Sequence, residues 1–417
     1  MCNASRCHCK QRNKSALYVF ERNISWSIPS FLHTTPTMKI ALVHFTAPPV
    51  HGGVERVVDE QIRTFRAAGH NVTLACFEGG TESKADSHIP LDRNASRTEL
   101  TTYLCSALSG VDCVLMHNVG TMPFAPELTA ALQQLPTLLP ETRWICWVHD
   151  LAATNPDYAA AMEGENGELF KKACSGWEYV AVSAYPQRQV EEFLHIACDV
   201  IPNGVDPART LELSPEVVSL AESHGWWDAD LVLMNPARLL PRKTVEIGIQ
   251  VARAADSMGF RMQYIVTGAS DMHNGGQGVY IKHLNQLRET LGVKHMVHFL
   301  SESMEVGSQQ LCDIYKVADA VFLPGSREGF GLPVLEAGVF GKPVFCPDVP
   351  PLCCLPGAIT YPADMAVPEL SRWFISQIKA QHTIIARRKI LREYRWQSIY
   401  QNHLAPLLSR AHATNPS

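Results

Sequence analysis

The sequence has no long apolar run and no excess of charge of one sign. None of its hydrophobic stretches approaches the roughly 20 uninterrupted residues that a membrane-spanning helix needs. We therefore expect no transmembrane segment, although peripheral contact with a membrane stays open. The 36 Lys and Arg residues are outnumbered by 41 Asp and Glu residues, and they are scattered along the chain. This balance argues against a protein that binds nucleic acid.

The sequence also lacks the features of a secreted protein stabilised by disulfides. Its 13 cysteines form an odd set without a repeating spacing, and a chain of 417 residues can bury sizeable cores without disulfides. Residues 1–37 contain only a short apolar patch, which does not suit a signal peptide. We expect reduced thiols, a cytoplasmic location and a poorly ordered extension over residues 1–37. That extension is either a true part of the protein or the product of a start codon assigned upstream of Met38.

From Met38 onward, short β-rich apolar runs alternate with longer amphipathic segments, a pattern typical of βαβ units and parallel sheets. The strands expected in the first half are Ile40–Phe45, Asn71–Cys76, Cys113–His117, Arg143–Val148 and Tyr179–Val182, with a helix at Glu55–Ala68 after the first of them. The strands expected in the second half are Leu231–Asn235, Arg261–Thr267, Met296–Phe299, Ala320–Leu323 and Pro343–Cys346.

A turn of Pro202, Asn203 and Gly204 separates the two series of strands. We predict an α/β fold with two doubly wound, Rossmann-like domains that face a central cleft. The domains cover residues 38–203 and 204–383, and a carboxyl-terminal helix and tail cover residues 384–417. Sheets of this kind bind ligands outside the carboxyl ends of their strands, so the functional site is expected in the cleft.

The stretch "SREGFGLPVLE", residues 326–336, follows the strand expected to end at Leu323, so its first part forms a loop at the carboxyl edge of the sheet. Pro333 suits the first turn of a following helix, where its missing N–H costs nothing. Gly329 and Gly331 allow the backbone to approach a ligand closely. The free N–H groups at the helix start then favour an anion such as a diphosphate.

Two acids of this stretch are candidate binding residues. Glu336 lies about one turn into the helix and faces the cleft if Val334, Leu335 and Val339 face the core. Its carboxylate can then accept hydrogen bonds from a ribose diol, and Glu328 in the loop can accept from sugar hydroxyls. The competing interpretation is that Glu328 is a solvated loop acid and that Glu336 complements the helix dipole.

Two cations follow the strand Leu231–Asn235 at its carboxyl end. Arg238 and Lys243 can converge on the cleft, because Pro241 interrupts the loop that carries them. Negative charge grows on a leaving diphosphate, and each preorganised donor that stabilises it is worth about 3 kcal/mol. These cations would replace a metal, so we expect neither a metal nor a cofactor.

One acidic pair matches the D-x-D pattern of metal-dependent transferases of another fold. Asp228 and Asp230 precede Leu231, however, and therefore lie at the amino end of the strand, away from the expected ligand edge. We expect a solvated turn there.

The first half of the chain offers weaker candidates. Gly52 and Gly53 are expected in the loop before the first helix, where they either approach a phosphate or an acceptor hydroxyl or form a plain turn. The nicotinamide fingerprint G-x-G-x-x-G is missing there, so a Rossmann-like domain does not imply NAD. His149 and Asp150 end a strand at the same cleft, although a strand-end histidine is more often structural. Ser183 is either a ligand contact or a helix N-cap.

Several ordered motifs carry a resemblance to a known family. They are "HGGVERV", "WVHD", "VIPNGVD", "PARLLPRKTVE" and "EGFGLPVLE". With these motifs the chain, from Met38 to about residue 408, resembles the glycosyltransferase family 4 enzymes. These are retaining nucleotide-sugar transferases of the GT-B fold. The resemblance implies that Arg238 and Lys243 contact the diphosphate and Glu336 the ribose. It also implies sugar contacts for Glu328 and His149.

The same resemblance assigns further donor contacts to Gly53, Gly329, Phe330, Gly331 and Leu332. The family often has a glycine after the lysine of the cationic motif, whereas Thr244 follows Lys243 here. This departure bears on the shape of that loop.

The activity implied is that of a hexosyltransferase that moves a glycosyl group from a nucleotide-diphospho-sugar to a hydroxyl acceptor with retention of configuration. The implied mechanism is a same-face substitution in which the departing phosphate oxygen helps to deprotonate the acceptor. Two kinds of alternative stay open. One is a phosphorylase, epimerase or hydrolase of a sugar nucleotide on the same fold. The other is a non-catalytic subunit that binds sugar nucleotides.

Overall fold

The structure of the chain is a computed structural model that describes residues 36–268 and 277–410. The extension predicted over residues 1–37 lies almost wholly outside the described residues. Within the described residues, every helix is too short or too polar to cross a lipid bilayer. The cysteines of this part of the chain are all free thiols, as the sequence predicts.

Two parallel sheets are present in the described residues, one with seven strands and one with six. The strand order is β3-β2-β1-β4-β5-β6-β7 in the first sheet and β10-β9-β8-β11-β12-β13 in the second. The strands of the first sheet are β1 (Lys39–Val43), β2 (Asn71–Cys76), β3 (Ser87–Pro90), β4 (Cys113–His117), β5 (Arg143–Val148), β6 (Trp177–Ala181) and β7 (Asp199–Val200). Those of the second are β8 (Leu231–Asn235), β9 (Met262–Val266), β10 (Val297–Phe299), β11 (Ala320–Phe322), β12 (Val344–Pro347) and β13 (Ala358–Tyr361).

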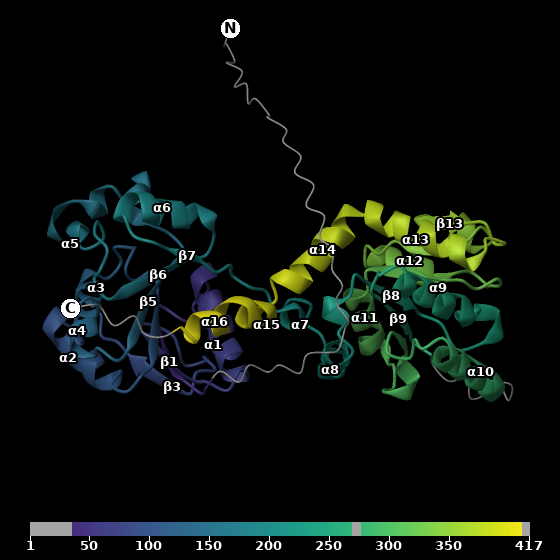
Figure 1. Cartoon of the computed structure of the whole chain (residues 1–417), viewed down its shortest axis with the longest axis horizontal. Coiled ribbons are helices and arrows are strands. Elements are labelled where there is room, and N and C mark those ends of the chain that lie inside the picture. The colour runs from purple at the N-terminus through teal and green to yellow at the C-terminus, as the bar shows by residue number, and fades with distance from the viewer. Residues whose placement is uncertain (1–35, 269–276, 411–417) are drawn as a thin grey trace, which may run out of the picture. The chain divides into compact units, whose positions relative to one another are not determined.

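Helices connect nearly all of these strands (Figure 1). Their bounds are α1 (Gly53–Ala67), α2 (Arg97–Ala107), α3 (Pro126–Leu132), α4 (Leu135–Leu138), α5 (Gly164–Glu168), α6 (Ala184–Leu194), α7 (Pro207–Thr210), α8 (Pro215–Ser223), α9 (Val245–Ser257), α10 (Gln277–Thr290), α11 (Ser308–Val317), α12 (Leu332–Val339), α13 (Val367–Ala380), α14 (His382–Glu393), α15 (Trp396–Ile399) and α16 (Ala405–Leu408).

Each sheet is covered on both faces. Successive residues of a strand point to opposite faces, and in β1 Ala41 and Val43 enter one hydrophobic core while Ile40 and Leu42 enter another. The strand β8 is divided in the same way between two cores of the second sheet. Both sheets are therefore doubly wound, and the predicted α/β fold class is confirmed. The central cleft expected between them stays a prediction.

The sequence patterns missed three strands, β3, β7 and β13, and all three lie at sheet edges. An edge strand is short and only partly covered, so it lacks the continuous apolar run that marks a central strand. In β3, for example, Ile89 is buried between the exposed residues His88 and Pro90.

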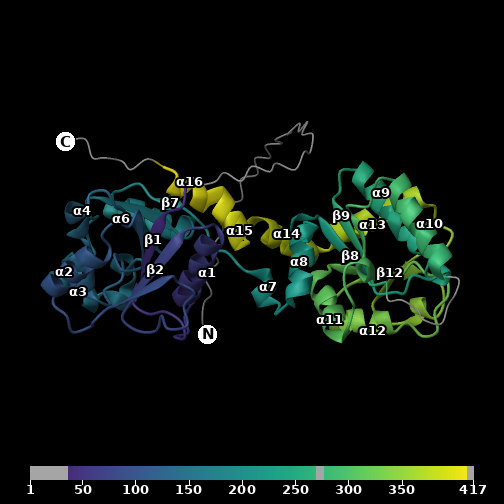
Figure 2. The same cartoon turned by 90° about the horizontal axis from the view of Figure 1, so that it is seen from below.

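The carboxyl-terminal helix predicted from residue 384 onward is broken after α14. At the break the Val205 amide donates to the Tyr394 carbonyl (2.7 Å), and beyond it α15, a π-helical turn and α16 pack on the first sheet (Figure 1 and Figure 2). Arg143 of β5 anchors this end. Its guanidinium donates to the Leu407 carbonyl (2.9 Å) and forms an ion pair with Glu178 (2.7 Å).

Candidate active site

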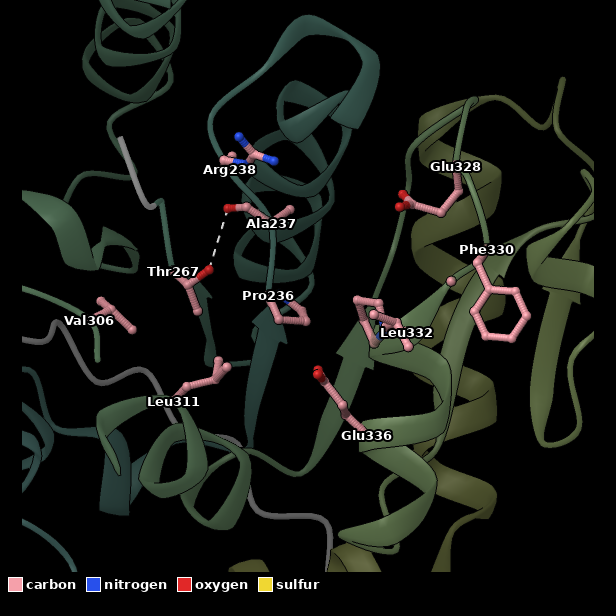
Figure 3. A pocket seen from close by; sticks show the side chains of 12 residues that line it. Pro236, Ala237, Arg238, Thr267, Val306, Leu311, Glu328, Phe330, Leu332 and Glu336 are labelled. Atoms are coloured by element: carbon pink, nitrogen blue, oxygen red, sulfur yellow. Dashed lines mark hydrogen bonds between the residues drawn. The ribbon is translucent and has the colours of Figure 1, made fainter. Parts of the chain in front are cut away.

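A pocket of about 400 Å³ lies at the carboxyl edge of the second sheet (Figure 3). It sits where the strand order reverses between β8 and β11, the position at which doubly wound sheets bind their ligands. Its volume falls in the range of small-molecule sites. The predicted site residues that line it are Arg238, Glu328, Phe330, Gly331, Leu332 and Glu336. We call it the β8 pocket.

The elements around the β8 pocket place these side chains. Arg238 follows the end of β8, whereas Glu328 lies in the loop between β11 and α12, and Glu336 lies on α12. Gly331 caps α12 with a φ of 101° in the left-handed region, where glycine has no steric penalty. A Cβ at this position would also lie 2.8 Å from Leu352 and Leu355, so only glycine suits this helix start.

The carboxylate of Glu336 is held in place by a residue that sequence reasoning missed. The Tyr315 hydroxyl donates to Glu336 Oε2 (2.8 Å), and the Tyr315 ring is buried and stacked on Phe340 with their planes 3° apart. Burial, and then the neighbouring Glu336, raise the pKa of Tyr315 so that it stays a donor. Its position on α11 suits a core residue, so no local pattern indicates this contact.

The predicted core face of α12 is partly wrong. Val334 is buried as expected, together with Ala337, but Leu335 is 38% exposed and Val339 is 86% exposed. Val334 and Ala337, three residues apart, share the buried face of α12, whereas Leu335 and Val339, four residues apart, share the exposed face. Glu336 nevertheless lines the β8 pocket, as predicted.

Lys243 lies in a short 3-10 turn and does not line the β8 pocket itself. Its ammonium group pairs with Glu328, and both side chains are largely shielded from water, with 14% and 20% exposed. The structure therefore brings together two predicted site residues as partners of each other. We call them the Lys243–Glu328 pair.

The loop that carries Lys243 is fixed by the residue that departs from the family pattern. Thr244 adopts a φ of 44°, an unfavourable conformation for a β-branched residue. Its hydroxyl donates to the Pro324 carbonyl (2.6 Å). This bond ties the lysine loop to the segment that leads into Glu328.

Gly329 belongs to the same loop and is exposed, but it is not among the residues that line the β8 pocket.

The D-x-D pair lies at the opposite edge of β8. Asp228 pairs with Arg395 (2.8 Å), and Asp230 pairs with Arg261 (3.3 Å) and Arg392. These carboxylates are thus engaged by arginines. Within the part of the chain that the structure describes, no group of three or more His, Cys, Asp or Glu side chains could hold a metal ion.

The corresponding edge of the first sheet carries three histidines. His44, His117 and His149 follow or end β1, β4 and β5, and we call them the histidine cluster. His44 Nδ1 donates to the His117 carbonyl (2.8 Å), and His149 Nε2 lies 3.1 Å from His117 Nδ1. Burial lowers the pKa of His149 to about 4 and lowers that of His117 well below the usual value. Only His149 of these three was singled out from the sequence.

Asn118 supports the turn that bears His149 and Asp150. Its side-chain oxygen accepts from the backbone amides of both residues, at 2.8 and 3.2 Å. Its amide group donates to the Asp150 carboxylate (3.3 Å). Ser183 precedes α6, and its side chain makes no capping hydrogen bond.

The prediction that Gly53 lies in the loop before the first helix is wrong, because α1 begins at Gly53 itself. Glu55 folds back over this helix start. It accepts from the Thr46 hydroxyl (2.5 Å), and its Oε1 lies 3.7 Å from His44 Nε2. The neighbouring His44 lowers the pKa of Glu55 to about 2, although burial opposes the change. A carboxylate thus already complements the positive end of α1, which disfavours a second anion there.

Comparisons with known proteins agree with this architecture. A family model described as Glycosyltransferase Family 4 matches residues 51–209, and one described as Glycosyl transferases group 1 matches residues 220–354. The mannosylglucosylglycerate synthase of Thermotoga maritima is 23% identical over 358 residues, which span 74% of this chain and 80% of that protein. A D-inositol 3-phosphate glycosyltransferase of Geodermatophilus obscurus is 30% identical over 34% of this chain and 33% of its own length.

Among solved structures, that of HepE from Anabaena in complex with UDP and glucose is 18% identical. The match covers 89% of this chain and 100% of that one, with a TM-score of 0.38. The two family models between them include most of both sheets, from α1 to the β8 pocket. The chain belongs to the glycosyltransferases of the family 4 type.

Proposed function

We propose that the protein transfers a hexosyl group from a nucleotide-diphospho-sugar to a hydroxyl acceptor, with retention of anomeric configuration. The observation that carries the proposal is the β8 pocket, in which Arg238 and the start of α12 flank the carboxylates of Glu328 and Glu336. A cation and a helix N-terminus suit a diphosphate. Two carboxylates that accept hydrogen bonds suit the hydroxyls of the ribose and of the sugar, which lie at the two ends of the diphosphate.

The Lys243–Glu328 pair gives each partner a role in this reaction. The donor diphosphate competes with Glu328 for the Lys243 ammonium group, and Glu328 is then free to accept from hydroxyls of the transferred sugar. Arg238 and Lys243 stabilise the charge that develops on the leaving phosphate. Their charges would provide the countercharge for which other transferases use a metal ion.

The acceptor hydroxyl attacks the anomeric carbon from the same face that the nucleotide diphosphate leaves. The new glycosidic bond forms as the bond to the phosphate oxygen breaks, and that departing oxygen takes the proton of the acceptor. His149 is proposed to hydrogen-bond the sugar. Because Glu55 already occupies the start of α1, we propose that an acceptor presents an uncharged hydroxyl there, not a phosphate.

A thermal-shift screen with nucleoside diphosphates and their sugars tests the proposal. A ligand at 100 times its Kd stabilises the folded state by about 2.7 kcal/mol, so the correct donor should raise Tm clearly. The products then distinguish the alternatives. A glycoside of retained configuration supports the transferase, whereas free sugar, a sugar 1-phosphate or an epimer identifies a hydrolase, a phosphorylase or an epimerase. Binding without turnover would favour a silent subunit.

Glu336→Ala is expected to raise the donor KM at least tenfold while kcat stays close to the parent value. Its contacts with a ribose are made equally before and during bond breaking, and such uniform binding affects KM. Tyr315→Phe should give a smaller rise in KM, because it removes only the hydrogen bond that orients the carboxylate. Steady-state kinetics with the donor varied provide the measurement. A fall in kcat at unchanged KM would show that Glu336 acts on the reacting centre.

Activity is expected to survive EDTA. In the proposed mechanism Arg238, Lys243 and the start of α12 provide the countercharge of the diphosphate, so removal of divalent cations should change kcat/KM by less than about twofold. Initial rates before and after extensive chelation measure this. A loss of activity that Mg²⁺ or Mn²⁺ restores would contradict the assignment of the cations.

A further inference from the structure

A line of buried hydrogen bonds runs from α1 to His149. Gln61 on α1 is completely buried, and its Oε1 lies 3.1 Å from His117 Nε2. His117, also completely buried at the end of β4, in turn lies 3.1 Å from His149 Nε2 through its Nδ1. The mechanism proposed above uses only His149 of these three residues.

The chemistry of these groups fixes the direction of the line. A carboxamide oxygen only accepts, so His117 must carry its proton on Nε2. Burial keeps His117 neutral by lowering its pKa, so its Nδ1 has no proton and accepts. His149 must then donate from Nε2. Because neutral imidazole carries one proton, the Nδ1 of His149 is left with a lone pair.

The surroundings hold the two rings in this arrangement. His44 donates to the His117 carbonyl, and the Asn118 side chain binds the backbone amide of His149. His44 and Glu55 are the titratable groups whose charges act on His149, and their effects on its pKa oppose each other. The Nε2 of His149 is therefore engaged by His117, whereas its Nδ1 has no hydrogen-bond partner among the residues that the structure describes and is left for a ligand.

We propose that Gln61 and His117 are positioning residues that fix the tautomer of His149, so that its Nδ1 accepts a hydrogen bond from a substrate hydroxyl. The identity of that hydroxyl rests on the proposed function, in which it belongs to the transferred sugar. The tautomer itself does not. A lone pair at this position recognises a group that can donate and repels the acceptor-only oxygens of a phosphate or carboxylate.

Replacement of Gln61 by glutamate is expected to reverse the direction of the hydrogen bond between His117 and His149. The new carboxylate stabilises a proton on both nitrogens of His117, whose Nδ1 then donates to His149. His149 must accept at Nε2 and carry its proton on Nδ1, so it offers a substrate hydroxyl a donor in place of a lone pair. Gln401→Glu, at an exposed position, is the charge-matched control. Long-range proton–nitrogen NMR of the full chain labelled at histidine reports the tautomers directly.

The parent and Gln401→Glu should show His149 protonated on Nε2, and Gln61→Glu should show it protonated on Nδ1. With the donor identified, Gln61→Glu should lower kcat/KM about tenfold to a hundredfold, as expected for one lost hydrogen bond to a ligand. Among the variants, kcat/KM should fall where the tautomer of His149 changes, whether or not the variant also has a lower Tm. If Gln61→Glu does not fold, Gln61→Met removes the acceptor, and His149 should then show a mixture of both tautomers.

The assignment of the His149 tautomer and the role of His149 Nδ1 in recognition can each be disproved independently. An Nδ1-protonated His149 in the parent, or a single unchanged tautomer in Gln61→Met, overturns the directional line whatever the activity. A reversed tautomer with unchanged kcat/KM overturns the role of His149 Nδ1 in recognition. If the parent turns over no sugar nucleotide, the proposed function fails, whereas the spectra still decide whether Gln61 and His117 set the tautomer.

Discussion

Replacement of Lys243 by alanine is expected to lower kcat about 10²–10³-fold, which would be the largest catalytic effect of a single change in this chain. The interaction of its ammonium group with the diphosphate strengthens as the leaving group departs, and loss of such a donor raises the barrier by about 3–4 kcal/mol. The change also leaves Glu328 without its partner, so a second negative charge then faces the diphosphate.

A double-mutant cycle separates these two effects. Glu328→Ala alone should reduce turnover through lost sugar contacts, and adding it to Lys243→Ala should cost less than the sum, because the unpaired carboxylate is removed as well. Lys294→Ala is the matched control, since that lysine is 69% exposed and does not line the β8 pocket. Rapid-quench or steady-state rates give kcat. An unchanged kcat in Lys243→Ala would mean that the diphosphate binds elsewhere.

Lowering the pH from 7 to 5 is expected to reduce the free energy of unfolding by at least about 4 kcal/mol. Burial, followed by neighbouring charges, lowers the pKa of His149 to about 4 and that of His298 to about 3, and it lowers the pKa of His117 well below its usual value. In the unfolded chain all three titrate near 6.5, so below that pH the unfolded state binds more protons and stability falls. At pH 5 His149 and His298 each contribute about 2 kcal/mol, from 1.5 pH units at about 1.4 kcal/mol each, and His117 adds to the loss in the same direction.

A loss of this size is comparable to the whole stability of many domains, which is about 5–15 kcal/mol. Urea unfolding at pH 7, 6 and 5 measures it. Glu55, whose pKa lies at about 2, should add nothing in this window because its contribution is lost only below its unfolded value. His298→Asn should reduce this loss by about 2 kcal/mol. A stability that does not change between pH 7 and 5 would show that these imidazoles become protonated without unfolding.

The central strands could be predicted from the sequence because they are buried on both faces. Asn71–Cys76, Cys113–His117 and Leu231–Asn235 appear in the structure with the predicted bounds, and each is a nearly continuous apolar run. The helix start at Gly53 was missed because glycine is a poor signal for a helix. It is tolerated there because Glu55 and the preceding loop stabilise the helix start.

The residues of the candidate site also fall into two groups, those that local sequence patterns could place and those that they could not. Arg238 and Glu336 could be placed because the carboxyl ends of parallel strands meet at one edge, and both line the β8 pocket. The residues that orient Glu336 and His149 could not be placed in this way. Tyr315 precedes Glu336 by 21 residues, and Gln61 and His117 lie 56 residues apart, each at a position whose periodicity suits a core. Such contacts depend on how elements pack, which local patterns do not encode.

The return of the last helices to the first sheet bears on how this chain folds during synthesis. Ile399, Leu404 and Leu407 complete the hydrophobic core that contains Ile62 and Phe65 of α1, and Leu407 supplies a carbonyl to Arg143. Until the ribosome has released these residues, that face of α1 remains open to water and the buried guanidinium lacks its backbone partners. The half of the protein that is translated first therefore cannot complete its packing until the end of the chain has been translated, and a nascent chain halted before α15 would expose an apolar surface to chaperones.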